Sequence, residues 1–254
     1  MKTMLKYDFL YWLRTAKLVV YGVLAIFLAM LSVLTARFLN VLLTWAFESE
    51  GIPIDGVPEP TVFDSYEQFF SNQSQLFMLV ALFIGLSFYT HARNRGHYPI
   101  LFSKPIRRQD FLLSKAILMN VFTVLALWLS ALVFGLYTAL LFEGFEPMRF
   151  FLAMIPFTVF FIFMMHVALF FSVIFKSYIL AAVLSIAVLV FLPVFSFIDH
   201  GVFGVLPGQL MNGSLAYLQD AEHSHIWGAS LVTLGLSVIL LIASLVCFNK
   251  RPLT

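Results

Sequence analysis

Charged residues are scarce in this chain of 254 residues: 11% are Asp, Glu, Lys or Arg, whereas 61% are hydrophobic. The mean hydropathy of +0.96 lies far above that of a soluble domain. The stretches between the apolar runs are too short to form a separate folding unit of the usual ~100 residues. These shortages exclude a soluble globular protein and indicate one integral membrane domain over residues 1–254.

The sequence also lacks several patterns that carry chemistry. A single cysteine, Cys247, excludes an internal disulfide. No His-Glu-x-x-His pair, Gly-x-Ser-x-Gly turn or Gly-x-x-x-x-Gly-Lys-Ser/Thr loop is present, and these patterns bind zinc, expose a catalytic serine and hold ATP phosphates. His223 and His225 alone are weak grounds for a metal site, which needs a third ligand. We therefore expect no metal site and no ATP-hydrolysing loop in this chain.

What the sequence does contain is six long apolar runs. A helix needs about 20 apolar residues to cross the hydrocarbon layer. No Asp or Glu lies inside the six runs, which disfavours a proton- or sodium-coupled transporter because such proteins hold carboxylates or histidines at mid-membrane. The predicted fold class is an all-α integral membrane protein with six transmembrane helices at 18–47, 74–92, 111–142, 150–175, 178–198 and 226–248.

The charges that remain are sorted by sign. Thirteen of the 15 Lys and Arg residues fall in four segments, and these alternate along the chain with segments that hold 11 of the 13 acids. Basic loops stay in the cytoplasm, so both termini are predicted to be cytoplasmic. The net charge of +2 gives no sign of nucleic-acid binding. The four basic segments are Lys2–Lys17, Arg93–Lys115, Lys176 and Lys250–Arg251.

The first basic segment, residues 1–17, predicts an amphipathic helix at the membrane interface. On a helical wheel its cations Lys2, Lys6, Arg14 and Lys17 occupy about a third of the circle. We expect this helix to lie flat on the cytoplasmic surface in contact with lipid, with Tyr11 and Trp12 in the headgroup layer. Leu10 and Leu13 intrude on the cationic sector, so the amphipathic pattern is moderate.

Two polar residues within the runs are candidates for a transport path. Arg37 lies about 30 Å of helix rise beyond Lys17, near the outer interface, where reaching toward headgroups or pairing with an external acid is the alternative. His166 is the only histidine deep in a predicted span. A hydrogen bond between helices is the alternative for that residue.

Two outer segments differ in character. The external loop 48–74 holds six acids and three prolines, which favours solvated irregular chain. Residues 197–225 mix apolar residues with helix-interrupting ones, and broken backbone in lipid needs protein or water to satisfy its polar groups. Either a pair of re-entrant helices or a surface loop with one interfacial helix fits this segment. The interrupting residues are Gly201, Gly204, Pro207, Gly208 and Gly213.

The loop His91–Lys115, which we call the inner loop, carries six basic residues. Its apolar middle, Tyr98–Ser103, is flanked by charge, and Pro99 suits a first helical turn while Pro105 suits a stop. Asp110 is expected to be the N-cap of the next span. A short apolar helix exposed at the cytoplasmic face invites docking by another protein.

At this loop the chain resembles the permease subunits of the ABC-2 family of ATP-binding-cassette transporters. Those proteins carry Gly, a few apolar residues, Ser-x-Pro, basic residues and a downstream Lys. This chain has Gly96, Ile100–Phe102, Ser103-Lys104-Pro105-Ile106-Arg107-Arg108 and Lys115. It departs from the family at Ala92-Arg93-Asn94-Arg95, where many members have an acid.

The resemblance implies a role for the inner loop. A coupling helix formed by Tyr98, Pro99, Ile100, Leu101, Phe102, Ser103 and Lys104 would contact a separate ATP-binding-cassette ATPase subunit, with Arg107 and Arg108 nearby. ATP and Mg would be bound by that ATPase, and no cofactor by this chain. A second copy of the chain, or a homologous permease, would complete the path.

The predicted function is therefore that of the permease subunit of an ABC exporter in the bacterial plasma membrane. The 30 Phe residues favour an amphipathic or hydrophobic cargo, peptides first and lipid-like molecules second. The family branches that fit best are exporters of antimicrobial or toxin peptides and immunity permeases. Two alternatives stay open: a membrane enzyme with an unrecognised site, and a membrane anchor or sensor subunit that transports nothing.

Overall fold

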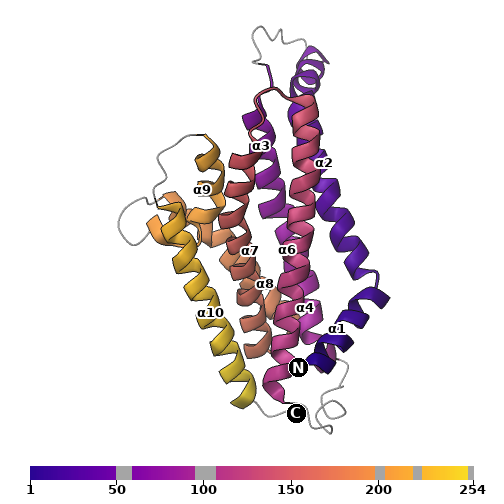
Figure 1. Ribbon diagram of the computed structural model, residues 1–254, viewed down its shortest axis with the longest axis vertical. Helices are drawn as coiled ribbons and strands as arrows, with labels where there is room; N and C mark the ends of the chain where they lie inside the picture. The colour runs from indigo at the N-terminus through magenta and orange to yellow at the C-terminus, as the bar shows by residue number, and fades with distance from the viewer. Residues whose placement is uncertain (50–58, 95–106, 198–203, 220–224, 251–254) are drawn as a thin grey trace.

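A computed structural model of the chain describes residues 1–49, 59–94, 107–197, 204–219 and 225–250 (Figure 1). All regular structure in these ranges is helical, and the helices form one elongated bundle. Five of them are long and apolar enough to cross a membrane. The prediction of an all-α, multi-pass membrane protein is thus confirmed. The candidate spans are Lys17–Leu39, Val62–His91, Arg108–Leu141, Pro147–Ile174 and Ile226–Lys250.

The helices follow one another along the chain with few interruptions. In order they are α1 (Lys2–Arg14), α2 (Lys17–Ser49), α3 (Val62–Asn72), a π-helical turn (Gln73–Phe77), α4 (Met78–Asn94), α6 (Arg108–Leu141), α7 (Pro147–Ile174), α8 (Tyr178–Phe191), a 3₁₀ turn (Leu192–Phe197), α9 (Gln209–Leu218) and α10 (Ile226–Lys250). The first helix and the last turn of α10 lie at the same end of the bundle (Figure 1). We call it the basic end, because Lys2, Lys115 and Lys250 lie on the helix segments there.

The second span begins earlier than the sequence predicts. Residues 62–72, expected to be irregular external chain, form α3, which continues through a π-helical turn into α4. The backbone N–H and the hydroxyl of Thr61 both donate to Oδ2 of Asp64, at 2.7 and 2.8 Å, which caps the new helix. Its apolar face is buried, with Tyr66, Phe69 and Phe70 at most 3% exposed. Burial of this face outweighs the acidic and proline-rich composition of the loop before it.

A π-helical turn joins α3 to α4 inside the bundle. Gln73 opens this turn and is fully buried. Its Nε2 donates to the backbone oxygen of Ala25 in α2 at 3.2 Å and to Oγ of Ser130 in α6 at 3.3 Å. A π turn adds one residue to a helix and turns the following residues to a new side. The turn therefore sets how α3 and α4 face their neighbours.

α7 is the central helix, packed against α4, α6, α8, α9 and α10. Its phenylalanines fill the core: Phe150, Phe157, Phe160 and Phe161 are all fully buried. Aromatic rings meet at short distances, such as 5.0 Å between the ring centroids of Phe134 and Phe150. Many of the chain's aromatic residues therefore pack the bundle itself, which leaves fewer for an internal surface.

The predicted span 178–198 is only partly a long helix. α8 has 14 residues, about 21 Å at 1.5 Å per residue, against about 30 Å of hydrocarbon. A 3₁₀ turn extends it, and α9 then packs on α7 and α10. The start of α9 lies close to the end of α8, because a Cβ on Gly208 would come within 2.2 Å of the Leu192 oxygen. α9 is thus folded back on the bundle.

Candidate functional site

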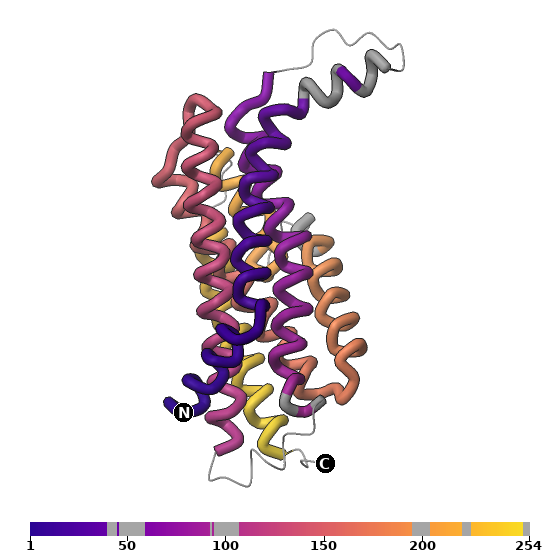
Figure 2. Tube along the Cα trace, turned by 90° about the vertical axis from the view of Figure 1, so that its right-hand side faces the viewer, coloured from indigo at the N-terminus to yellow at the C-terminus, as the bar shows by residue number. Residues whose placement is uncertain are grey.

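The amino-terminal helix is part of the bundle at its basic end. α1 runs obliquely across the lower part of the molecule and packs mainly on α6 and also on α2 (Figure 2). One side of the helix is covered by protein. Met4, Asp8 and Trp12, spaced four residues apart, are at most 4% exposed. That spacing places the three side chains on one face, which fixes the side that α1 turns to the bundle.

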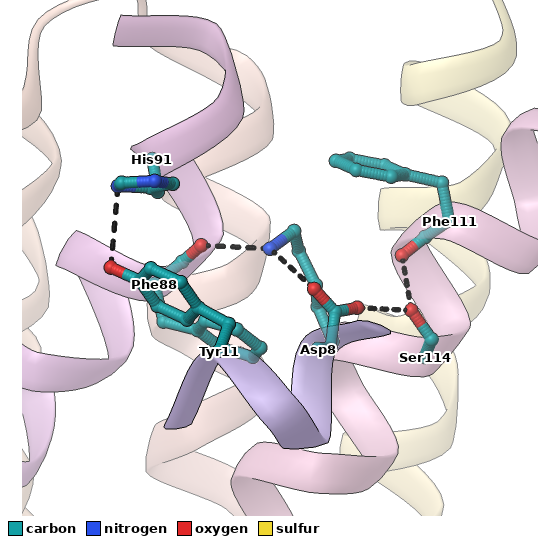
Figure 3. A network of polar contacts seen from close by, with 7 residues as sticks. Asp8, Tyr11, Phe88, His91, Phe111 and Ser114 are labelled. Atoms are coloured by element: carbon teal, nitrogen blue, oxygen red, sulfur yellow. Dashed lines mark hydrogen bonds and ion pairs between the residues drawn. The ribbon is translucent and has the colours of Figure 1, made fainter. Parts of the chain in front are cut away.

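Asp8 and Lys115 form a buried ion pair at the centre of this contact (Figure 3). Nζ of Lys115 lies 3.3 Å from Oδ1 of Asp8, and the hydroxyl of Ser114 donates to Oδ2 at 2.6 Å. The two charged side chains are 4% and 2% exposed. Burial of a charge is costly unless it is paired and hydrogen-bonded. Both Asp8 oxygens are occupied, so α1 is held to the start of α6 in one orientation.

Lys115 also reaches the end of α4. Its Nζ donates to the backbone oxygen of Phe88 at 3.1 Å and lies 3.9 Å from the centroid of the Phe88 ring. The ring of Phe111 is 5.2 Å away on α6. A cation over aromatic faces is stabilised, most strongly where water is excluded. The ammonium group therefore connects α1, α4 and α6 at a single point.

Further contacts tie α1 and the start of α2 to the last turns of α4. The hydroxyl of Tyr11 lies 3.3 Å from Nδ1 of His91, and the two rings are 4.6 Å apart (Figure 3). At the start of α2, Nζ of Lys17 donates to the hydroxyl of Ser87 at 2.9 Å. α4 ends just before residues 95–106 of the inner loop, and α6 begins just after them. The two helices that flank these residues are therefore held in place by contacts with α1 and α2.

The start of α6 differs from its prediction. Arg107 is the N-cap, and Asp110 lies in the first turn of the helix, so the prediction of an Asp110 N-cap is wrong. The carboxylate of Asp110 instead pairs with the Met1 ammonium group at 2.9 Å. Arg108 donates to the backbone oxygen of Asn249 at 3.1 Å, which joins the start of α6 to the last turn of α10.

The predicted interface helix exists as α1, but its orientation corrects the sequence analysis. Trp12, expected in the headgroup layer, is fully buried, and its ring centroid lies 4.6 Å from that of Phe122 with the two rings tilted to each other. The side of α1 that carries Met4, Asp8 and Trp12 faces protein, because α6 provides Lys115 as the partner of Asp8 and the ring of Phe122 as the neighbour of Trp12. Lys2, Lys6 and Arg14 are exposed, whereas Lys17 is half-buried.

The predicted docking helix cannot be placed. Tyr98–Lys104 lie outside the described residues, as does His223. Of the two arginines that follow, Arg107 is exposed and Arg108 is half-buried. In the part of the chain that the structure describes, no three His, Cys, Asp or Glu side chains come together as a metal site would require.

The two candidate transport-path residues lie far apart along the bundle. Arg37 is exposed, 5.9 Å from the ring of Phe142. His166 is buried between α6 and α7, with Nε2 3.0 Å from Nδ2 of Asn120. That contact is the interhelical hydrogen bond weighed above. The other polar atoms of the pair, Nδ1 of His166 and Oδ1 of Asn120, have no hydrogen-bond partner among the described residues.

Sequence reasoning missed Asp8, although a signal was present. Only two of the 13 acids, Asp8 and Asp110, fall in segments that are otherwise basic. Each is paired with a cation at the basic end, Asp8 with Lys115 and Asp110 with the Met1 ammonium. Acids that break a sorted charge pattern are therefore the residues to examine for structural pairing.

Comparison of the chain with known protein families and with curated proteins finds no match.

Proposed function

We propose that this chain is the permease subunit of an ABC exporter. Two six-span subunits, copies of this chain or homologous ones, form the path, and two separate ATPase subunits bind and hydrolyse ATP with Mg. The chain acts as the conduit and not as an enzyme. Its cargo is amphipathic or hydrophobic and is most simply a peptide. The complex resides in the bacterial plasma membrane with the basic end in the cytoplasm.

The observation that carries this proposal is the bracing of the inner loop. The loop's sequence resembles the coupling segment of ABC-2 permeases, and it is flanked by the ends of α4 and α6. Lys115 bonds to α4 and to α1 at the same point, at 3.1 and 3.3 Å. A loop that receives a push from an ATPase needs rigid supports to pass the movement into the membrane. The buried ion pair provides such supports.

The interior of the bundle supports the choice of cargo. The buried side chains of α6 and α7 are mostly aromatic and aliphatic, and the polar ones among them are serine and threonine hydroxyls together with Lys115 and His166. A path formed beside such helices has little to offer a sugar or an ion, whose hydration must be replaced by polar groups. An amphipathic peptide or lipid-like molecule needs no such replacement along its apolar side.

The test is purification of the tagged chain from its native membrane, followed by identification of the proteins that accompany it. We expect an ATPase with nucleotide-binding motifs in equal amount to the chain. Changing Leu101 and Phe102 to Asp should remove that ATPase from the complex. The matched control is Met148→Asp, because Met148 is 72% exposed at the opposite end of the bundle.

A chain that purifies alone, and is stable without an ATPase, would contradict the proposal and favour the membrane enzyme or the anchor. Those two differ in a simple way. Catalytic activity in the isolated chain that His166→Ala abolishes indicates an enzyme, whereas a stable complex whose partner ignores every cargo indicates an anchor or sensor.

A further inference from the structure

The outward side of α1 combines cations with exposed apolar side chains. Lys2, Lys6 and Arg14 are exposed, and no described residue pairs with any of them. Beside them, Phe9, Leu10 and Leu13 are 42%, 39% and 53% exposed. Of the two acids at the basic end, Asp8 is paired with Lys115 and Asp110 with the Met1 ammonium. We call Lys2, Lys6, Phe9, Leu10, Leu13 and Arg14 the outer face of α1.

The direction of this face is fixed by the buried ion pair. Asp8 is turned to the bundle and bonded on both oxygens, and Met4 and Trp12 are buried with it on the same side. At 100° per residue, Lys6 and Lys2 lie roughly opposite that side. α1 therefore cannot roll to bury its leucines or to turn its cations elsewhere without breaking the Asp8–Lys115 pair.

From this geometry we infer that the outer face of α1 binds the headgroups of anionic phospholipids. Water alone is a poor environment for a face with three large exposed apolar side chains. At the boundary between headgroups and acyl chains the same mixture is favourable: lysine and arginine reach phosphates, and leucine and phenylalanine enter the acyl region. The inference requires only that the chain spans a membrane, so it stands apart from the proposed exporter function.

Charge selects anionic lipid over neutral lipid. Each Lys or Arg near an anionic surface strengthens binding by about fivefold, and the effect falls off within a Debye length. With three unpaired cations on one helix, the face should prefer phosphatidylglycerol to phosphatidylcholine by well over tenfold. Because Lys115 joins α1 to α4 and α6, lipid on this face would also steady the supports of the inner loop.

The experiment uses the full-length protein reconstituted in phosphatidylcholine nanodiscs with or without phosphatidylglycerol. Native mass spectrometry then counts the phospholipids of each class that stay bound after release. The test variant is Lys2→Gln/Lys6→Gln, and its matched control is Lys176→Gln/Lys250→Gln. Both variants remove two exposed charges at the basic end, but only the first changes α1. We expect the first to lose most of the preference for phosphatidylglycerol and the control to keep it.

A second variant separates the fixed face from bulk charge. Asp8→Asn makes the chain more positive, so simple charge attraction predicts more bound phosphatidylglycerol. If the ion pair fixes the direction of the outer face, the same variant should instead bind less, because α1 is free to roll. Melting curves and the buried emission of Trp12, with the other three tryptophans changed to Phe, check that α1 stays in place in the two lysine variants.

Equal retention of phosphatidylglycerol by the Lys2/Lys6 variant and the parent would overturn the inference. A second result would also overturn it: an associated protein that, in a lipid-free complex, protects Lys2 and Lys6 from amine-reactive reagents. A protein would then cover this face. Neither result depends on whether an ATPase accompanies the chain.

Discussion

Lys115 and Asp8 lie 107 residues apart in the sequence, yet Nζ and Oδ1 meet at 3.3 Å in the interior of the protein. This contact makes the amino-terminal helix a part of the bundle, since a helix that rested on the membrane alone would have no reason to bury an acid. It also joins the two helices that flank the inner loop, because the same ammonium group bonds to the Phe88 oxygen at 3.1 Å.

The ion pair predicts that the effects of changing Asp8 and Lys115 are not additive. Lys115→Met leaves Asp8 buried without a counter-charge, and Asp8→Asn leaves Lys115 buried without one. Loss of one partner of a buried pair costs about 3–5 kcal/mol, whereas loss of both is often close to neutral. We expect each single variant to melt well below the parent in detergent, and the double variant to melt above Lys115→Met.

Lys250→Met serves as the control for that cycle, since Lys250 is exposed at the same end of the bundle. It should melt with the parent. Additive losses in the double variant would mean that the two side chains do not interact, and the description of α1 as a fixed support would then be wrong.

Trp12 provides an independent measure of how α1 is seated. The residue is fully buried against Tyr21, Phe88 and Phe122, whereas its neighbour Leu13 is 53% exposed. Trp12→Ala leaves a cavity and should lower the free energy of unfolding by about 3–5 kcal/mol. Leu13→Ala should change it little in detergent. A Trp12 whose emission is readily quenched by acrylamide in the folded parent would place this ring at the surface instead.

The sequence predicts the helical membrane class well because hydropathy over 20 residues is a strong signal, and five of the six runs become long helices. It predicts the boundaries poorly where burial competes with composition, as in α3. Residues 62–73 follow a proline-rich acidic stretch, yet Phe69 and Phe70 find aromatic partners such as Phe134 and Phe157 and are buried. Such partners come from distant parts of the chain.

The same limit explains α1. A helical wheel ranks its faces by polarity, and by that measure Trp12 belongs in lipid headgroups. A helical wheel does not include contacts with other helices. The ion pair with Lys115 turns Asp8 toward the bundle, and Trp12, on the same face of α1, is thereby placed beside Phe122. The π turn at Gln73 could not be predicted from the sequence either, because the Gln73 side chain donates hydrogen bonds to Ala25 and Ser130 on two other helices.

Asn120 and His166 predict a second, weaker cycle. Their hydrogen bond of 3.0 Å joins α6 to α7, and bonds of this kind between membrane helices contribute about 0.6–2 kcal/mol. Asn120→Leu and His166→Leu should each lower the melting temperature by a few degrees. The double variant should lose less than the sum, because no polar group of the pair is left behind.

A different outcome would give His166 a transport role. If His166→Leu melts with the parent but changes export or ATP turnover in the complex, the residue contacts the path and the bond to Asn120 is incidental. Thermal melting and turnover should therefore be measured on the same preparations.

Gly208 tests how α9 is held to the bundle. Its φ of −60° is open to every residue, so glycine is required there for space alone. A Cβ would approach the backbone oxygen of Leu192 to 2.2 Å and its carbonyl carbon to 2.9 Å, and a backbone cannot move aside as a flexible side chain does. Gly208→Ala should therefore force the start of α9 away from the end of α8 and lower the melting temperature clearly.

Gly228→Ala is the matched control, because nothing lies within 4 Å of the added Cβ in the first turn of α10, and alanine there favours the helix by up to about 1 kcal/mol. Equal melting of the two variants would show that the start of α9 does not pack against the 3₁₀ turn that follows α8, and α9 would then need a different arrangement.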